Sequence, residues 1–290
     1  MFEDFEHHRL TTATAEIDLV AAGEGFPVLL LHGFPQTRAA WHLVAPQLAR
    51  HYRVIVPDLP GYGASRGPTP SADGATHSKR SMAAAMVEVM ESLGHDEFAV
   101  AGHDRGGRVA YRMALDHPNR VNRLAVMDIM TTIDTWEEMD WKAALRSYHW
   151  PLLAQDAPVV ERLLGADPGF YLDHLLNRWK GEGAELDPAA VAEYRAAMER
   201  PEVRAAMAAD YRAGAGIDRE LDEADRDARH FIACPMLLIR GRQYEPRSLL
   251  DAWTGWGEAL AEEVFDCGHF LAEEKPEQTT AALAAFFGAV

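Results

Sequence analysis

The sequence predicts an α/β protein with a mostly parallel, doubly wound sheet that is interrupted by a helical insertion. Three observations favour this class. Short apolar runs alternate with helical stretches over the first 128 residues, which is typical of strands joined by crossover helices. The alternation stops near residue 129 and resumes near residue 230. Several apolar runs end in turns that carry Asp or His, at the sheet edge where such proteins bind ligands.

The individual elements follow from these runs. Strands are predicted at residues 17–20, 28–31, 54–56, 98–101 and 124–127, with helices at 38–49, 79–93 and 109–115. Residues 129–229 read as helices and loops without a convincing strand. Later strands are expected at 235–239 and 263–265, and a closing helix at 277–287. We therefore expect a sheet domain made of residues 1–128 and 230–290, with residues 129–229 forming a helical lid.

Composition narrows the class of function. The chain has 28 Lys and Arg against 45 Asp and Glu, a formal net charge of −17, which disfavours binding to nucleic acid or to an anionic membrane. It shows no signal-peptide pattern and no apolar run long enough to span a membrane, so a cytoplasmic protein is expected. Cys234 and Cys267 form no Cys-x-x-Cys pair and are expected to be small buried residues.

The most informative segment is GHDRGGR, at residues 102–108. A strand, a sharp turn flanked by Gly and a helix form the setting of a nucleophile elbow, which usually carries Ser. Here the position holds Asp104, and a carboxylate can attack a saturated carbon to form an ester that water then cleaves. Arg105 and Arg108 lie in the same turn, which predicts that the attacked molecule is an anion.

Two further residues complete a catalytic set. Asp128 follows the strand at 124–127, and His269 follows the last strand. Nucleophile, acid and histidine in this chain order are typical of α/β-hydrolases. These enzymes often carry the acid after the strand that here ends at Ile239, but that loop has no Asp at the expected position. We favour Asp128 as the acid, with Glu245 as the alternative.

Four motifs together resemble one family. The segments HGFPQT (32–37), DLPGYG (58–63), GHDRGGR (102–108) and GHF (268–270) resemble the fluoroacetate dehalogenase branch of the α/β-hydrolase superfamily, whose relatives include haloalkane dehalogenases and epoxide hydrolases. Most of these motifs are shared with the epoxide hydrolases. Arg105 and Arg108 together are the narrower mark, since epoxide hydrolases usually have Trp directly after the nucleophile.

The resemblance implies a role for each matching residue. Asp104 would attack the carbon that bears the halogen, while Arg105 and Arg108 hold the substrate carboxylate. His269, oriented by Asp128, would activate the water that hydrolyses the ester. The backbone N–H groups of Phe34 and Arg105 would form the oxyanion hole. In the lid, His149, Trp150 and Tyr211 match the halide-binding residues, and Trp179 is expected nearby.

The implied activity is that of a haloacetate dehalogenase, which converts short 2-haloacids to 2-hydroxyacids. The resemblance implies no metal or organic cofactor, water as the co-substrate and a homodimer. The nearest alternative is an epoxide hydrolase, which would need two lid tyrosines among Tyr148, Tyr171, Tyr194 and Tyr211. Another is a non-catalytic protein that binds a small molecule on the same scaffold. The preferred halogen is left open by the sequence.

Overall fold

A computed structural model describes residues 1–257 and 260–288, and within them the strands form a single eight-stranded sheet. The strands are β1 (Glu6–Thr11), β2 (Glu16–Ala22), β3 (Pro27–Leu31), β4 (Arg53–Pro57), β5 (Phe98–His103), β6 (Val121–Met127), β7 (Met236–Gly241) and β8 (Leu260–Phe265). Their order in the sheet is β1-β2-β4-β3-β5-β6-β7-β8. The mostly parallel α/β class expected from the sequence is confirmed.

The sheet is parallel from β4 to β8 and antiparallel at the other edge, where β2 pairs with both β1 and β4. The edge strand β1 was absent from the sequence prediction. Its residues, EHHRLT, are largely exposed and carry no apolar run. A polar edge strand of this kind gives almost no hydrophobic signal, because little of it faces a core.

The α-helices cover both faces of the sheet and fill the insertion. They are α1 (Ala45–Leu48), α2 (Lys79–Ser92), α3 (Arg105–Asp116), α4 (Thr132–Glu137), α5 (Trp141–Arg146), α6 (His149–Leu153), α7 (Val159–Ala166), α8 (Pro168–Trp179), α9 (Pro188–Met198), α10 (Pro201–Ala215), α11 (Ile217–Ala228), α12 (Leu250–Trp253), α13 (Leu271–Glu274) and α14 (Pro276–Phe287). Two short 3₁₀ helices, η1 (Arg38–Trp41) and η2 (Ala75–His77), lie in loops.

Alternating side chains of each strand belong to two separate cores. In β3, Leu29 and Leu31 join the core that contains residues of α2 and α3, whereas Val28 and Leu30 join the core that contains residues of α1 and α14. Successive residues of a strand point to opposite faces, so both faces of a helix-covered sheet must be apolar. This pattern explains why the central strands read as continuous apolar runs.

The helix predicted at residues 38–49 is wrong as a continuous element. The structure has η1, a short connection and then α1, which begins at Ala45 with Pro46 in its first turn. Proline has no backbone N–H and clashes with the preceding turn of a helix, so it is tolerated only at a helix start. A continuous helix through Pro46 is therefore unfavourable, and the chain restarts there.

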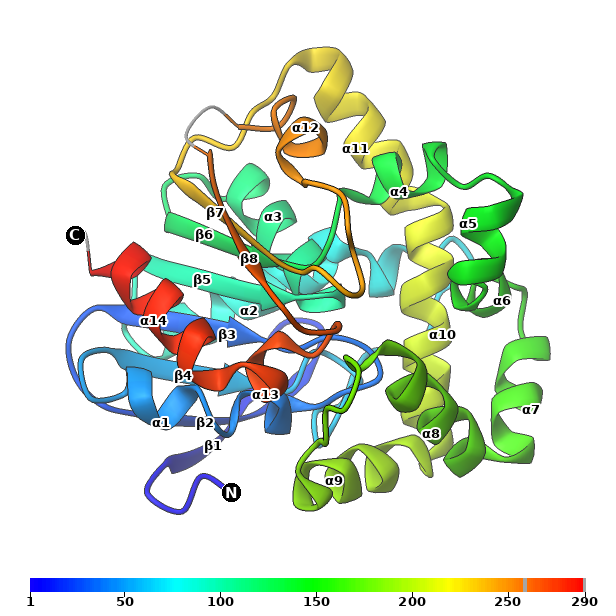
Figure 1. Ribbon diagram of the computed structural model, residues 1–290, viewed down its shortest axis with the longest axis horizontal. Helices are drawn as coiled ribbons and strands as arrows, with labels where there is room; N and C mark the ends of the chain where they lie inside the picture. The colour runs from blue at the N-terminus through cyan, green and yellow to red at the C-terminus, as the bar shows by residue number, and fades with distance from the viewer. Residues whose placement is uncertain (258–259, 289–290) are drawn as a thin grey trace.

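The residues between β6 and β7 include the helices α4 to α11, which we call the inserted segment (residues 132–228). Most of its helices lie beside one end of the sheet, with α5 to α8 and α10 at the right of Figure 1. Helix α10 runs through this group and packs against α6, α7, α9 and α11. None of the described helices is long and apolar enough to cross a membrane.

Candidate active site

The turn between β5 and α3 holds Asp104 in an unusual backbone conformation. Its backbone has φ 47° and ψ −116°, a strained conformation for any residue with a side chain. The glycines beside it are required by space. A Cβ atom on Gly102 would lie 2.3 Å from the carbonyl oxygen of Gly106, and one on Gly106 would lie 2.3 Å from that of His32. This is the geometry of a nucleophile elbow.

The two carboxylate oxygens of Asp104 have different surroundings. Oδ1 accepts a hydrogen bond of 2.8 Å from the backbone N–H of Phe34, while Oδ2 lies 3.8 Å from Nε2 of His269. Burial by itself would raise the pKa of Asp104, but the nearby charges of His269 and Arg105 hold it below its ordinary value. Asp104 is therefore an ionised carboxylate with one oxygen available to react.

His269 is held by a second carboxylate. Its Nδ1 lies 2.6 Å from Oδ2 of Asp128, and the backbone N–H of Gly241 donates to Oδ1 of the same Asp at 3.0 Å. Glu245, the alternative acid, instead accepts a hydrogen bond of 3.2 Å from Arg247. The imidazole therefore lies between two aspartates, Asp104 and Asp128, on the carboxyl ends of neighbouring strands β5 and β6.

The protonation state of His269 follows from this position. Burial lowers its pKa, but the hydrogen bond to Asp128 and the charges of Asp128 and Asp104 outweigh burial and raise the pKa to about 9. With Asp104 ionised, the imidazole is therefore a cation near neutral pH. Esterification of Asp104 would remove one of the two charges that hold this proton.

Tyr244 is a site residue that the sequence analysis missed. Its ring lies 4.2 Å from that of His269, with an angle of 32° between the planes, and Trp179 meets the same imidazole edge-on at 5.6 Å. Tyr244 also lines the cavity above Asp104. Its place directly before Glu245, the alternative acid, is the one sequence signal that could have identified it.

The predicted role of Arg105 requires a guanidinium that is free to bind a ligand, but the structure shows it bound to another side chain. Its Nε and Nη2 bind the carboxylate of Asp210 in α10 at 3.0 and 2.7 Å, and Lys79 and Tyr62 bind the same carboxylate. Of the hydrogen bonds found within the described residues, none reaches its buried Nη1. Arg105 is fully buried and its charge is matched by Asp210, so Nη1 is its one nitrogen found without a partner among the described residues.

Arg108 differs from its neighbour in its partners. Its Nη1 and Nη2 donate to the hydroxyls of Thr132 and Thr135 at 3.3 and 3.1 Å, while its guanidinium lies over the ring of Trp150, 4.5 Å from the centroid. Its Nε is buried, without a partner in the described part of the chain. Burial, followed by the charge of Arg105, lowers the pKa of Arg108. Arg108 thus carries a buried positive charge whose hydrogen-bond partners are neutral.

The residues predicted to bind halide gather around Phe34. The rings of Phe34 and Tyr211 lie 5.2 Å apart, those of His149 and Tyr211 5.8 Å apart, and those of Trp150 and Tyr211 5.6 Å apart. Within the described residues, His149 Nδ1 and the Tyr211 hydroxyl are buried without hydrogen-bond partners. Burial lowers the pKa of His149 to about 3, so its ring is neutral. Such a group can surround a small anion with N–H and O–H donors.

The four tyrosines that an epoxide hydrolase could use have different surroundings; they are Tyr148, Tyr171, Tyr194 and Tyr211. The hydroxyl of Tyr194 hydrogen-bonds to Glu273. Tyr148 lies close enough to Tyr171 to raise its pKa, which burial raises first. Tyr211 is close enough to Asp104 for the carboxylate to influence its pKa, which burial raises first. The structure therefore brings Tyr211 to the predicted nucleophile.

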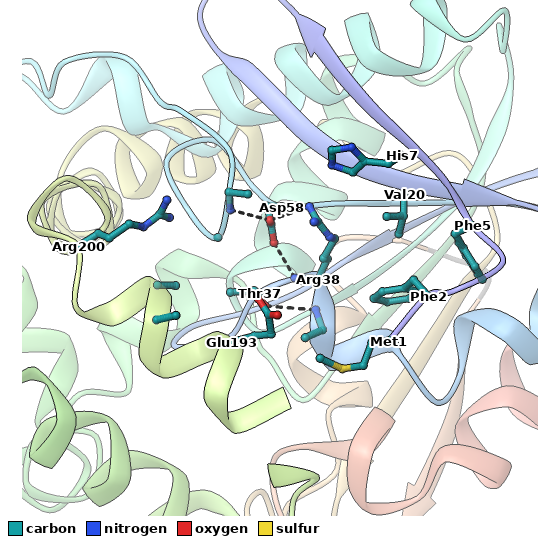
Figure 2. A pocket seen from close by; sticks show the side chains of 15 residues that line it. Met1, Phe2, Phe5, His7, Val20, Thr37, Arg38, Asp58, Glu193 and Arg200 are labelled. Carbon is teal, nitrogen blue, oxygen red and sulfur yellow. Dashed lines mark hydrogen bonds and ion pairs between the residues drawn. The ribbon is translucent and has the colours of Figure 1, made fainter. Parts of the chain in front are cut away.

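A cavity of about 520 Å³ joins these groups, with Asp104, Arg108, His149, Trp150 and His269 in its wall. A second hollow, of about 450 Å³, lies between the N-terminus, η1 and α9 (Figure 2). It contains none of the predicted site residues, and its Arg38 is already paired with Asp18 and Asp58. Across residues 1–257 and 260–288, no three His, Cys, Asp or Glu side chains are grouped as metal ligands.

Comparison with known proteins agrees with this fold. Residues 27–276 match the model of the alpha/beta hydrolase fold family, and the chain belongs to that family. It is 40% identical over 290 residues to a fluoroacetate dehalogenase from Burkholderia sp, covering 99% of this chain and 95% of the relative. It is also 31% identical to a soluble epoxide hydrolase from Corynebacterium sp. (strain C12), covering 96% and 95% of the two chains.

The crystal structure of ALR0039 from Nostoc sp PCC 7120 superimposes with a TM-score of 0.95 at 42% identity and covers 100% of both chains. The family and its relatives make this chain a hydrolase of the α/β-hydrolase fold, and they confirm its resemblance to the fluoroacetate dehalogenases.

Proposed function

We propose that this protein is a haloacetate dehalogenase that hydrolyses short 2-haloacids to 2-hydroxyacids through an ester on Asp104. One observation carries the proposal. The cavity that holds the Asp104 carboxylate also holds Arg108, a buried cation with no carboxylate within ion-pair distance among the described residues. A buried charge without a counter-ion is costly, so a ligand that supplies an anionic group beside the nucleophile fits this site.

In the first step, Oδ2 of Asp104 attacks the carbon that carries the halogen. A C–O bond forms, the C–halogen bond breaks, and the halide leaves with the bonding electrons. The substrate carboxylate is held by Arg108 and by the free Nη1 of Arg105. The departing halide is stabilised by donors from His149, Trp150 and Tyr211, each worth on the order of 2–4 kcal/mol if it acts like an oxyanion-hole donor.

In the second step, water attacks the carbonyl carbon of the ester. Loss of the Asp104 charge lowers the pKa of His269, so the imidazolium releases its Nε2 proton to solvent. The neutral imidazole then accepts the proton of the attacking water at Nε2 while Asp128 holds Nδ1. The backbone N–H of Phe34, already bonded to Oδ1, stabilises the negative oxygen that develops there. The backbone N–H of Arg105, at the start of α3, is the second proposed donor. Collapse releases the hydroxyacid and restores the Asp104 carboxylate.

The test is halide release from fluoroacetate and chloroacetate by the purified protein, with Asp104→Asn as the control. Release that disappears in this variant supports the proposal, and a mass increase of His269→Gln after substrate addition would identify the trapped ester. Chloride release without fluoride release would retain the mechanism and count against the halide assignment. Release of neither halide, together with turnover of an epoxide, would favour epoxide hydrolysis, for which the free Tyr211 hydroxyl and the epoxide hydrolase relative argue.

The proposal assigns residues 129–229 to a lid over the sheet domain formed by residues 1–128 and 230–290. It also includes a homodimer. Of the ten large apolar side chains found exposed, five are in the inserted segment: Trp141, Leu145, Val159, Leu163 and Phe170. They lie on α5, α7 and α8, which are on the same side of the molecule in Figure 1. A concentration of exposed apolar residues is typical of a protein interface.

A further inference from the structure

Three exposed basic residues line the outer part of the active-site cavity. Beyond Asp104 and His269 the cavity is lined by Lys142 and Arg146 of α5 and by Arg178 near the end of α8. All three side chains are exposed. These three residues, which we call the mouth cations, play no part in the mechanism proposed above.

The mouth cations are close to one another and lack acidic partners. Lys142 and Arg146 are four residues apart on α5, so they share one side of that helix. Nη2 of Arg178 donates to the backbone carbonyl of Arg146 at 3.2 Å, which holds the two arginines together. Across the described residues, no Asp or Glu lies within ion-pair distance of Lys142, Arg146 or Arg178. Four other arginines do have such a partner: Arg195, Arg212, Arg219 and Arg247.

The acids that share this part of the cavity are already engaged. Arg247 binds Glu138 at 2.7 Å and Glu245 at 3.2 Å. The carboxylate of Asp140 accepts the backbone N–H of Ala143 at 2.8 Å at the start of α5. Lys142, Arg146, Arg178 and Arg247 bring four positive charges to this wall, against the three negative charges of Glu138, Asp140 and Glu245. The mouth of the cavity is therefore net positive, although the chain as a whole has a formal net charge of −17.

The charge of Arg146 also acts toward the interior of the site. Burial raises the pKa of Tyr244, and Arg146 is among the groups that oppose this rise. Tyr244 is the residue whose ring lies against His269. Arg146 is thus an exposed residue of the same cavity wall as Tyr244 and His269.

We propose that Arg146 and Arg178 form an outer subsite for small carboxylate anions, with Lys142 adding to its charge. The subsite would concentrate the anionic substrate at the mouth before Arg108 binds it. An otherwise acidic surface repels such a molecule, and a local positive cleft can raise its rate of capture by roughly 10–10³-fold. That the anion is a haloacid rests on the proposed function; that it is a carboxylate also suits the planar guanidinium pair.

The test compares the double variant Arg146→Gln/Arg178→Gln with Arg50→Gln/Arg162→Gln. The control loses the same charge from exposed arginines outside the cavity. For chloroacetate at about 0.01 M ionic strength, where screening extends to roughly 30 Å, we expect kcat/KM to fall about tenfold in the first variant, with kcat unchanged. At 0.3 M salt the two variants should agree within about twofold, because screening removes the attraction. Equal kcat/KM values at low salt would overturn the subsite.

A binding measurement separates this inference from the proposed function. If the wild-type protein releases no halide, the dehalogenase proposal fails, and trifluoroacetate is then used as an unreactive carboxylate probe followed by ¹⁹F line broadening. At low salt the wild type and the control should broaden the signal more than Arg146→Gln/Arg178→Gln. Equal broadening in all three proteins would refute the outer subsite whatever the reaction catalysed.

Discussion

At the scale of single residues, the charge state of His269 links the two proposed steps. The imidazole lies between Asp104 and Asp128, whose carboxylates raise its pKa to about 9 despite burial. An imidazolium cannot accept a proton from water, so His269 can act as a general base only after Asp104 loses its charge. Formation of the ester removes that charge, so the first step converts His269 from an acid into a base.

The raised pKa makes a prediction about stability. The ordinary pKa of this group is 6.5 and the folded value is about 9, so the stabilisation is complete below about pH 6.5 and is lost as the pH rises through 9. We expect the melting temperature of the wild type to exceed that of His269→Gln by several degrees at pH 6, and the difference to shrink at pH 10. Melting curves of both proteins across this range test it. A difference that grows with pH would contradict the assignment.

At the scale of elements, Arg105 connects the elbow to the inserted segment. Asp210 on α10 binds Arg105 at the start of α3, Lys79 at the start of α2 and Tyr62 in the loop after β4. This buried ionic group joins three parts of the sheet domain to one helix of the inserted segment. Arg108, four positions into the same helix α3, bonds only to hydroxyls. The two arginines are therefore expected to differ in what they contribute.

We expect Arg105→Gln chiefly to destabilise the fold, because removing one partner of a buried ion pair costs about 3–5 kcal/mol. Arg108→Gln should leave stability nearly unchanged and raise the KM for a haloacid roughly 10- to 100-fold, since a hydrogen bond to a charged group contributes about 1.5–3 kcal/mol. Urea denaturation and steady-state kinetics measure the two effects. Equal losses of stability in both variants would mean that Arg105 is not the structural member of the pair.

At the scale of the whole molecule, the exposed apolar residues of α5 and α8 lie on helices that also contribute to the wall of the active-site cavity. Trp141 and Leu145 alternate along α5 with Lys142 and Arg146. A partner bound to this helix would hold the mouth of the cavity in place. The proposed dimer and the proposed site would then share one element.

We expect Trp141→Glu/Phe170→Glu to convert a dimer into a monomer, because burying two carboxylates in an apolar interface is strongly unfavourable. Light scattering after size-exclusion chromatography gives the mass of each species. Val264→Glu, at an exposed position of β8, is the matched control. Dissociation in the control alone would assign pairing to the sheet edge and not to the inserted segment.

The sequence by itself determined the fold class, the elbow at Asp104 and the two residues, Asp128 and His269, that follow strands β6 and β8. These features depend on local patterns: apolar runs, turns that require glycine, and strand ends that must meet at one edge of a parallel sheet. The edge strand β1 and the break at Pro46 within 38–49 were missed, because one lacks an apolar signal and the other depends on a single residue.

The partners of the arginines were decided only by the tertiary structure. Asp210 lies 105 residues along the chain from Arg105, and Tyr244 meets His269 only when the loops after β7 and β8 come together. Contacts between distant segments depend on how helices and loops pack, and no local pattern of residue types encodes that packing. The same reason applies to the mouth cations, whose shared position comes from the approach of α8 to α5.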